Sequence, residues 1–188
     1  MKKARKKKSQ LVILNPQPFD VIVTLQPRGT NVIESKHLPA NDGHWVVPPP
    51  GPNGTWISYR RVSNNETLAS LLLPEGTTFA ELFWDTEISL IFKQNPKEKL
   101  VLANNTNQTV IVQYELQREI AISTNTLKPS GERGSSVVAR QQPRNGVDLW
   151  ITFKTQNGGL LTSFLASDAI SLVGVNGKAH YFITTTPL

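Results

Sequence analysis

The 188-residue chain has no cysteine, a single methionine and few charged side chains. Without cysteine it has no disulfide framework, no thiolate zinc site and no cysteine nucleophile, which fits a reducing compartment. Charged residues make up 18% of the chain, below the roughly 25% typical of soluble domains. Ser, Thr, Asn and Gln take their place, and this composition suits the surfaces of β-sheets and polar loops.

Long apolar runs are also absent. None approaches the roughly 18 residues that a membrane-spanning helix needs. The apolar stretch after the basic N-terminus comprises only Leu11 to Leu14 and ends at Asn15-Pro16, whereas a secretion signal needs about 7–15 apolar residues. We therefore expect neither a signal peptide nor a transmembrane segment.

Positive charge is concentrated at the N-terminus, where six of the first eight residues are basic: Lys2, Lys3, Arg5, Lys6, Lys7 and Lys8. Removing these six from the 20 Lys and Arg residues leaves 14, which equals the 14 Asp and Glu residues. The net charge of +6 therefore belongs to a short segment attached to a formally neutral body. Such a block repels itself and is normally a disordered interaction tail.

The partner that fits this basic segment is a polyanion. Neutralising phosphates of a nucleic acid releases counterions and gives an affinity that does not depend on sequence. Anionic lipid headgroups are the second candidate, at about 1 kcal/mol per basic residue. A merely solubilising tail is the alternative interpretation. The segment has no aromatic residue, so stacking on bases is not indicated.

The rest of the chain predicts short strands and one helical turn. Val, Ile, Thr and aromatic residues dominate short, often alternating runs, as half-buried strands prefer. These runs are 21–25, 55–63, 86–93, 109–115, 147–154 and 179–186. Four Asn-Gly pairs predict hairpin-type turns, at Asn53-Gly54, Asn145-Gly146, Asn157-Gly158 and Asn176-Gly177. A helical turn is predicted only at 77–83, after Pro74-Glu75-Gly76.

The two halves of the chain resemble each other. LVILN (11–15) matches LVLAN (100–104), and VIV (21–23) matches VIV (110–112), both at an offset of 89 residues. Trp56-Ile57-Ser58-Tyr59-Arg60 matches Trp150-Ile151-Thr152-Phe153-Lys154 at 94. The offset then returns to 91, where ISLIF at 88–92 matches AHYFI at 179–183. Insertions confined to loops are what an internal duplication produces.

These observations predict an all-β chain of two tandem, related antiparallel β-sandwiches, of Greek-key, jelly-roll or immunoglobulin-like type. The predicted division is a basic disordered arm (1–10), a first repeat (11–93), a polar linker (94–99) and a second repeat (100–188). A single jelly-roll barrel built from two related halves is the alternative.

The shared strand supplies the candidate interface residues: Trp56, Arg60, Trp150 and Lys154. Because side chains alternate along a strand, Ile57 and Tyr59 lie on the core face and Trp56, Ser58 and Arg60 on the other. Trp and Arg are favoured interface anchors, so this second face predicts contact with a partner. Two alternatives remain open. The Trp residues could cover the rim of each sandwich, or this face could pack one half on the other.

Catalytic motifs are lacking. His37, His44 and His180 are scattered without metal-ligand spacing, and no nucleophile elbow, P-loop or dinucleotide-binding motif occurs. We therefore expect no enzymatic activity, no metal, no cofactor and no small-molecule substrate.

A short Lys/Arg arm at 2–8 followed by a neutral β body from Leu11 onward resembles the layout of small viral or phage coat proteins. The resemblance implies a virion protein that self-assembles through its body and contacts other virion proteins. Its arm would face packaged nucleic acid or an internal membrane. A cytoplasmic location is the alternative. The competing hypothesis is a duplicated carbohydrate- or ligand-binding module, such as a lectin or adhesin.

Overall fold

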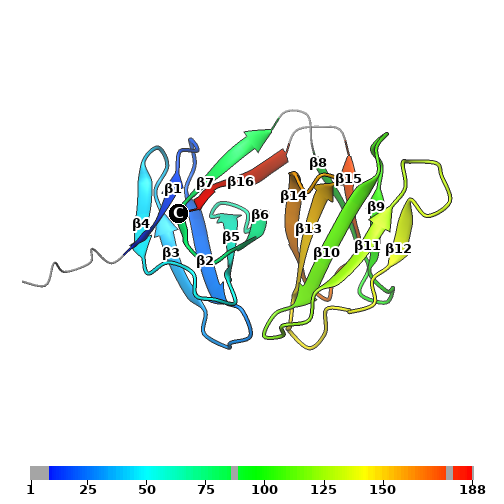
Figure 1. The fold of residues 1–188 in the computed structure, drawn as a ribbon, viewed down its shortest axis with the longest axis horizontal. Helices are drawn as coiled ribbons and strands as arrows, with labels where there is room; N and C mark the ends of the chain where they lie inside the picture. Colours follow the sequence, from blue (N-terminus) through cyan, green and yellow to red (C-terminus); the bar gives the residue numbers. More distant parts are fainter. Residues whose placement is uncertain (1–8, 86–88, 177–179, 188) are drawn as a thin grey trace, which may run out of the picture.

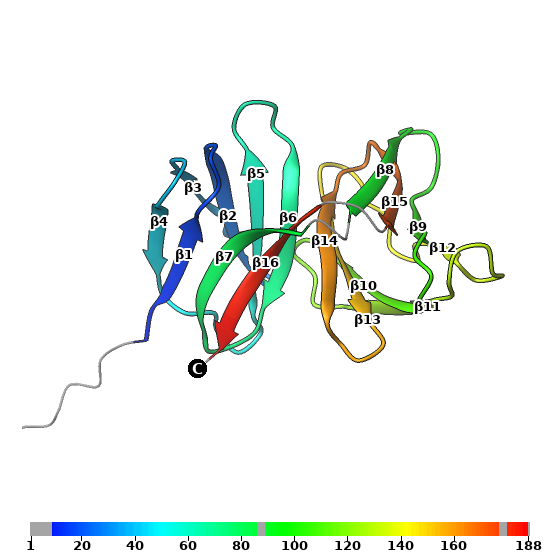
Figure 2. The same cartoon turned by 90° about the horizontal axis from the view of Figure 1, so that it is seen from above.

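A computed structural model describes residues 9–85, 89–176 and 180–187. The described residues form sixteen β-strands in four four-stranded sheets, none closed into a barrel (Figures 1 and 2). The sheets build two sandwiches that lie side by side. The predicted all-β class and tandem sandwiches are therefore confirmed, and the single-barrel alternative is wrong.

The first sandwich consists of sheet A, with strand order β16-β7-β1-β4, and sheet B, with order β3-β2-β5-β6. Their strands are β1 (Leu11–Asn15), β2 (Val21–Pro27), β3 (Glu34–Leu38), β4 (Gly43–Val47), β5 (Thr55–Arg61), β6 (Thr67–Leu73), β7 (Thr77–Asp85) and β16 (His180–Pro187).

The second sandwich consists of sheet C, with order β12-β9-β15-β8, and sheet D, with order β11-β10-β13-β14. Their strands are β8 (Ser89–Gln94), β9 (Val101–Asn104), β10 (Val110–Leu116), β11 (Ser123–Leu127), β12 (Ser136–Val138), β13 (Leu149–Thr155), β14 (Leu160–Ala166) and β15 (Ile170–Asn176).

The sheets are not purely antiparallel as predicted, because each sandwich contains one parallel pair. β1 pairs with β7 and β9 pairs with β15 in parallel, whereas the other ladders are antiparallel. Parallel neighbours need a crossover connection. Here that connection contains the strands of the opposite sheet, which lie between the two parallel strands in sequence. The parallel pair occurs at the same place in both sandwiches, which supports their relationship.

Each sandwich encloses its own apolar core, built from the alternating residues of both its sheets. Ile57 and Tyr59 lie in the first core, and Ile151 and Phe153 lie in the second, all at 0% exposure. The predicted core face of the shared strand is therefore confirmed.

A buried asparagine performs the same task in both sandwiches. The side-chain amide of Asn15 donates to the backbone carbonyls of Phe19, Leu38 and Pro39 at 3.0, 3.3 and 3.0 Å. The amide of Asn104 donates to the carbonyls of Gln108, Leu127 and Lys128, each 89 positions further along. The last letter of the repeated motifs LVILN and LVLAN thus ties the loop after the first strand to the end of the third.

The helical turn predicted at 77–83 is wrong, because these residues belong to β7. Ala80 and Leu82 are fully buried while Phe83 is 49% exposed, which is the two-residue period of a strand. Pairing with β1 on one side and β16 on the other satisfies the backbone of this segment.

The Asn-Gly pairs form turns of different kinds. Asn145 and Gly146 both have positive φ between Arg144 and Val147, which exchange backbone hydrogen bonds, as in a two-residue hairpin. Gly158 has positive φ in the β13–β14 hairpin. Gly54 also has positive φ, but it connects strands of different sheets, so the hairpin predicted there is wrong. Gly177 lies outside the described residues.

The last strand of each half belongs to the other sandwich. β8, from the first half, pairs with β15 in sheet C, and β16, from the second half, pairs with β7 in sheet A. Both ladders share one register. Moving from the pair Asp85–His180 to the pair Ser89–Asn176 advances four residues on one strand and retreats four on the other.

The strand exchange changes where the chain passes between the sandwiches. Residues 94–99, predicted as the linker, connect β8 and β9, which lie in the same sheet. The chain passes from one sandwich to the other between β7 and β8, and again between β15 and β16. The division into a first repeat (11–93) and a second repeat (100–188) remains a prediction.

Candidate functional site at the junction of the sandwiches

The predicted polyanion-binding residues, Lys2, Lys3, Arg5, Lys6, Lys7 and Lys8, lie outside the described residues. The first described residues, Ser9 and Gln10, are exposed and precede β1 directly. They line a shallow cavity of about 400 Å³ next to β1, together with Val46, Val47, Pro48 and Pro49.

The two tryptophans of the shared strand stack on each other between the sandwiches. Their ring centroids lie 4.8 Å apart and their planes differ by 2°. Trp56 is 4% exposed and Trp150 is fully buried. Of the three interpretations of this face, the structure therefore supports packing of one half on the other. Both rings are buried between the sandwiches, while Arg60 and Lys154 are half-buried.

A buried ion pair locks the same junction. The guanidinium of Arg28 donates to both carboxylate oxygens of Glu115, with its shortest contacts at 2.8 Å, and the Glu115 side chain is fully buried. The indole N–H of Trp56 donates to the same carboxylate at 2.6 Å. Bidentate Arg–carboxylate pairs are among the strongest hydrogen-bonded contacts in proteins. One carboxylate of the second half thus holds two side chains of the first.

Arg28 and Glu115 were not among the residues singled out from the sequence. The repeat gave no signal for this pair, because Glu115 corresponds to Gln26 and Arg28 to Gln117 at the offset of 89 residues, and neither counterpart is charged. Gln26 and Glu115 each lie beside the tryptophan of the neighbouring strand in their own half, Trp56 and Trp150. Arg28 of the first half pairs with Glu115 of the second half, whereas the corresponding positions, Gln117 and Gln26, are uncharged. The two charged residues meet only when the halves pack together.

Hydroxyl groups continue the junction along the neighbouring strands. The backbone N–H of Ser70 in β6 donates to the hydroxyl of Ser163 in β14 at 2.9 Å, and both residues are fully buried. Their cross-strand partners, Ser58 and Thr152, are also polar and buried. The surface between the sandwiches therefore combines these hydroxyl-bearing residues with Leu72 and Leu165, which lie beside the two tryptophans on the outer strands.

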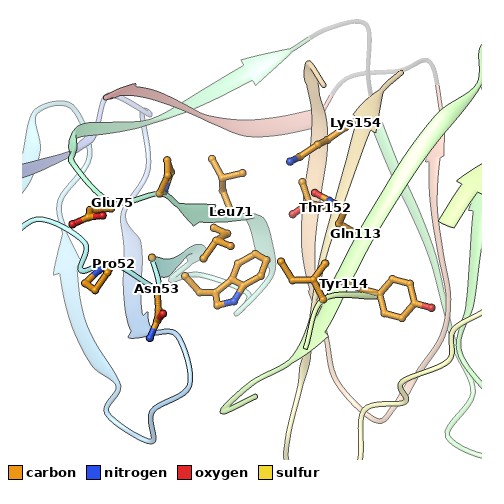
Figure 3. Close-up of a pocket in the computed structure, with 13 residues that line it drawn as sticks. Pro52, Asn53, Leu71, Glu75, Gln113, Tyr114, Thr152 and Lys154 are labelled. Atoms are coloured by element: carbon orange, nitrogen blue, oxygen red, sulfur yellow. The ribbon is translucent and has the colours of Figure 1, made fainter. Parts of the chain in front are cut away.

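Two grooves flank this junction, and they correspond through the repeat. The first, of about 380 Å³, has Lys154 and Thr152 pointing toward Leu71 of the first half (Figure 3). It is lined by Trp56, Leu71, Leu72, Glu75, Gln113, Ile122, Thr152 and Lys154, among others. The second, of about 800 Å³, is lined by residues that include Thr24, Ile33, Ser58, Arg60, Asp148, Phe164 and Leu165.

Corresponding residues occupy corresponding places in the two grooves. Arg60 matches Lys154, Ser58 matches Thr152 and Ile33 matches Ile122. Each groove therefore combines a cation and a hydroxyl group on the face of one sheet, an exposed isoleucine just before a strand of that sheet, and the edge strand of the other sandwich.

Two acidic groups have shifted pKa values. Half-burial, with a smaller contribution from Asp168, raises the pKa of Asp148 in the second groove to about 6. Elsewhere, the backbone N–H of Ala40 and the ring of His37 hold the pKa of Asp20 below its ordinary value. His37 Nε2 lies 2.7 Å from Asp20 Oδ2 on the exposed surface.

Within the described ranges, no group of three or more His, Asp or Glu side chains is placed to hold a metal ion. The same part of the chain holds no helix with the length and apolar character needed to cross a membrane. No protein-family model, curated protein or solved structure matches this chain.

Proposed function

We propose that this chain is a self-assembling structural protein, of the kind that forms viral shells, whose N-terminal arm binds nucleic acid. The observation that carries the proposal is the separation of charge: six basic residues in the first eight, and equal numbers of basic and acidic residues after them. A neutral body can pack against copies of itself without long-range repulsion, while the arm neutralises the phosphates of what is enclosed.

The composition of the arm favours nucleic acid over a membrane. Apart from Met1 and Ala4, every residue from 1 to 8 is basic, so these residues offer a bilayer positive charge but little apolar surface to insert. Stable attachment to a bilayer takes two signals, of which a basic patch is only one. A flexible single strand can instead follow the arm and make several phosphate contacts. A virion location follows from this proposal.

A charge-matched pair of variants tests the role of the arm. The arm variant changes Lys6, Lys7 and Lys8 to Ala. The body variant changes three exposed lysines to Ala, namely Lys97, Lys99 and Lys128. Both lose the same net charge. We expect only the arm variant to weaken binding to poly(dT) and to reduce the slope of log K against log salt by about 2.

Light scattering at low and high salt, with poly(dT) or with anionic vesicles, measures assembly in the same samples. Particles or oligomers that retain poly(dT) support the proposal. A monomer at every concentration, or an equal loss of binding in both variants, contradicts it. Retention of vesicles but not poly(dT) would assign the arm to a membrane.

The two corresponding grooves favour one competing function, a duplicated binding module. Paired sites on one chain would increase avidity for a repeating ligand such as a glycan. A glycan screen tests this with Arg60→Ala and Lys154→Ala, because the stacked tryptophans are inaccessible. Binding that falls in both single variants and is lost in the double variant would support it.

A further inference from the structure

We infer that copies of this chain join by exchanging β16, so that the C-terminal strand of one copy completes the first sandwich of another. The inference rests on the self-assembly proposed above and names the contact that mediates it. It starts from the observation that the first sandwich is completed by a strand that follows the entire second sandwich in the sequence.

The first sandwich depends on β16. This strand pairs with β7 along its whole length, from His180 to Pro187. Ile183 is 2% exposed and belongs to the first core, and the ring of Tyr181 packs edge-on against Phe19 at 5.8 Å. Without β16, the edge of β7 would expose unpaired backbone groups beside an open core, and such an edge is a template for another strand.

The strand that fills this edge need not come from the same copy. β16 of a second copy has the same sequence, so it would form the same ladder with β7 and place the same side chains in the core. Exchange of identical elements is a low-cost route to oligomers because it needs no new interface. The intrachain arrangement is favoured only by its effective concentration, in the mM range for short connections.

The contacts between the two halves do not replace this strand. Hydroxyl groups of Ser58, Ser70, Thr152 and Ser163 surround the tryptophan stack on the facing sheets. The tryptophan stack and the Arg28–Glu115 pair hold the two sandwiches together at this junction, but neither supplies a backbone partner for the outer edge of β7.

The arm gives this exchange a trigger. Copies bound along one nucleic acid by residues 2–8 would be held at a high local concentration, which reduces the advantage of the intrachain strand. Exchange should therefore increase with protein concentration and with poly(dT), and remain low for dilute protein at high salt.

Engineered cysteines test the exchange directly, because the natural chain has none. Glu81 and Thr184 are cross-strand partners in β7 and β16. A Glu81→Cys chain and a Thr184→Cys chain, carrying tags of different size, are mixed at high concentration with poly(dT) and oxidised. Exchange places the two thiols in register in different molecules, so heterodimers should exceed both homodimers several-fold.

The control uses a hairpin that does not exchange. The hydroxyl oxygens of Thr24 and Ser35 lie 2.9 Å apart on β2 and β3, which are consecutive in the chain. A mixture of Thr24→Cys and Ser35→Cys chains should show no such excess. Phe79→Cys with Thr186→Cys, a second cross-strand pair of β7 and β16, serves if the first pair disturbs folding.

The outcomes separate this inference from the proposed function. A heterodimer excess confined to the exchanged strands supports it, even if only dimers form. Assemblies by light scattering with no excess for either exchanged pair overturn the exchange and leave self-assembly standing. Equal cross-linking of exchanged and control pairs also overturns it, because random collision would then explain the products.

Discussion

One asparagine in each half donates hydrogen bonds to three backbone carbonyls where two loops meet. Its removal leaves those carbonyls buried without a hydrogen-bond donor. For Asn104→Ala we expect a loss of about 3 kcal/mol in the free energy of unfolding, because each unsatisfied buried group costs about 1–3 kcal/mol. The exposed neighbour Asn105→Ala is the control and should change stability by less than about 0.5 kcal/mol. Urea unfolding measures both, and equal effects would contradict the clamp.

The buried Glu115 carboxylate predicts a strongly non-additive pair of substitutions. Glu115→Gln should destabilise by about 3 kcal/mol, because it leaves the guanidinium of Arg28 without its counter-charge at 16% exposure. The double variant Arg28→Met with Glu115→Met should lose less free energy of unfolding than the sum of the losses in the single variants Arg28→Met and Glu115→Met. A double-mutant cycle in urea measures this coupling, and additive losses would show that the pair does not act as a unit.

Asp148 predicts a pH dependence with a definite sign. Its pKa of about 6 lies above the ordinary value of 3.8, so between these values the folded protein binds more protons than the unfolded chain. Its contribution to stability therefore falls as the pH rises from about 4 to 6. Asp148→Asn should stabilise the protein at pH 7.5 by about 1 kcal/mol, a figure reduced for solvent screening.

Urea titrations at several pH values check the prediction for Asp148. Asp168→Asn, which removes the neighbouring charge, should act in the same direction with a smaller effect. A stability gain for Asp148→Asn that is larger at pH 4 than at pH 7.5 would reverse the sign and contradict the assignment.

At the scale of elements, alternation and residue type predicted six of the sixteen strands (β2, β5, β8, β10, β13 and β16) but not their partners. ISLIF and AHYFI have similar patterns, so either segment suits the edge of either sandwich, and the local sequence does not specify which. Their exchange is decided by how the complete halves pack. The strand at 77–85 was missed because Pro74-Glu75-Gly76 is typical of a helix start, whereas pairing on both sides determines its conformation.

The candidate site shows the same limit. The repeated Trp and cation positions could be found from the sequence because both halves carry them. The Arg28–Glu115 contact could not, because it joins two positions whose repeat counterparts are both glutamine and which meet only across the junction.

Because β16 pairs with β7, a C-terminal truncation should affect residues that are far from it in sequence. Removing residues 180–188 should expose the first sandwich, because β7 loses its outer partner and the core loses Ile183. Hydrogen exchange should therefore speed up in β1 and β7, while β10 and β13 keep their protection. Deletion of residues 2–8 is the control. Loss of protection confined to the second sandwich would contradict the topology.

At the scale of the whole molecule, the buried junction predicts that both sandwiches unfold together. Neither sandwich takes a strand from the other, so the stacked Trp56 and Trp150 and the Arg28–Glu115 pair are the contacts that couple them. For 188 residues, one transition near 60 °C should have calorimetric and van't Hoff enthalpies that agree at about 130 kcal/mol, from roughly 0.7 kcal/mol per residue. Independent halves would give a van't Hoff value near half of that. Trp56→Leu with Trp150→Leu should lower the melting temperature and separate the transitions of the two sandwiches, because it removes the ring stack between them. Two transitions in the parent chain would show that the junction does not couple the sandwiches.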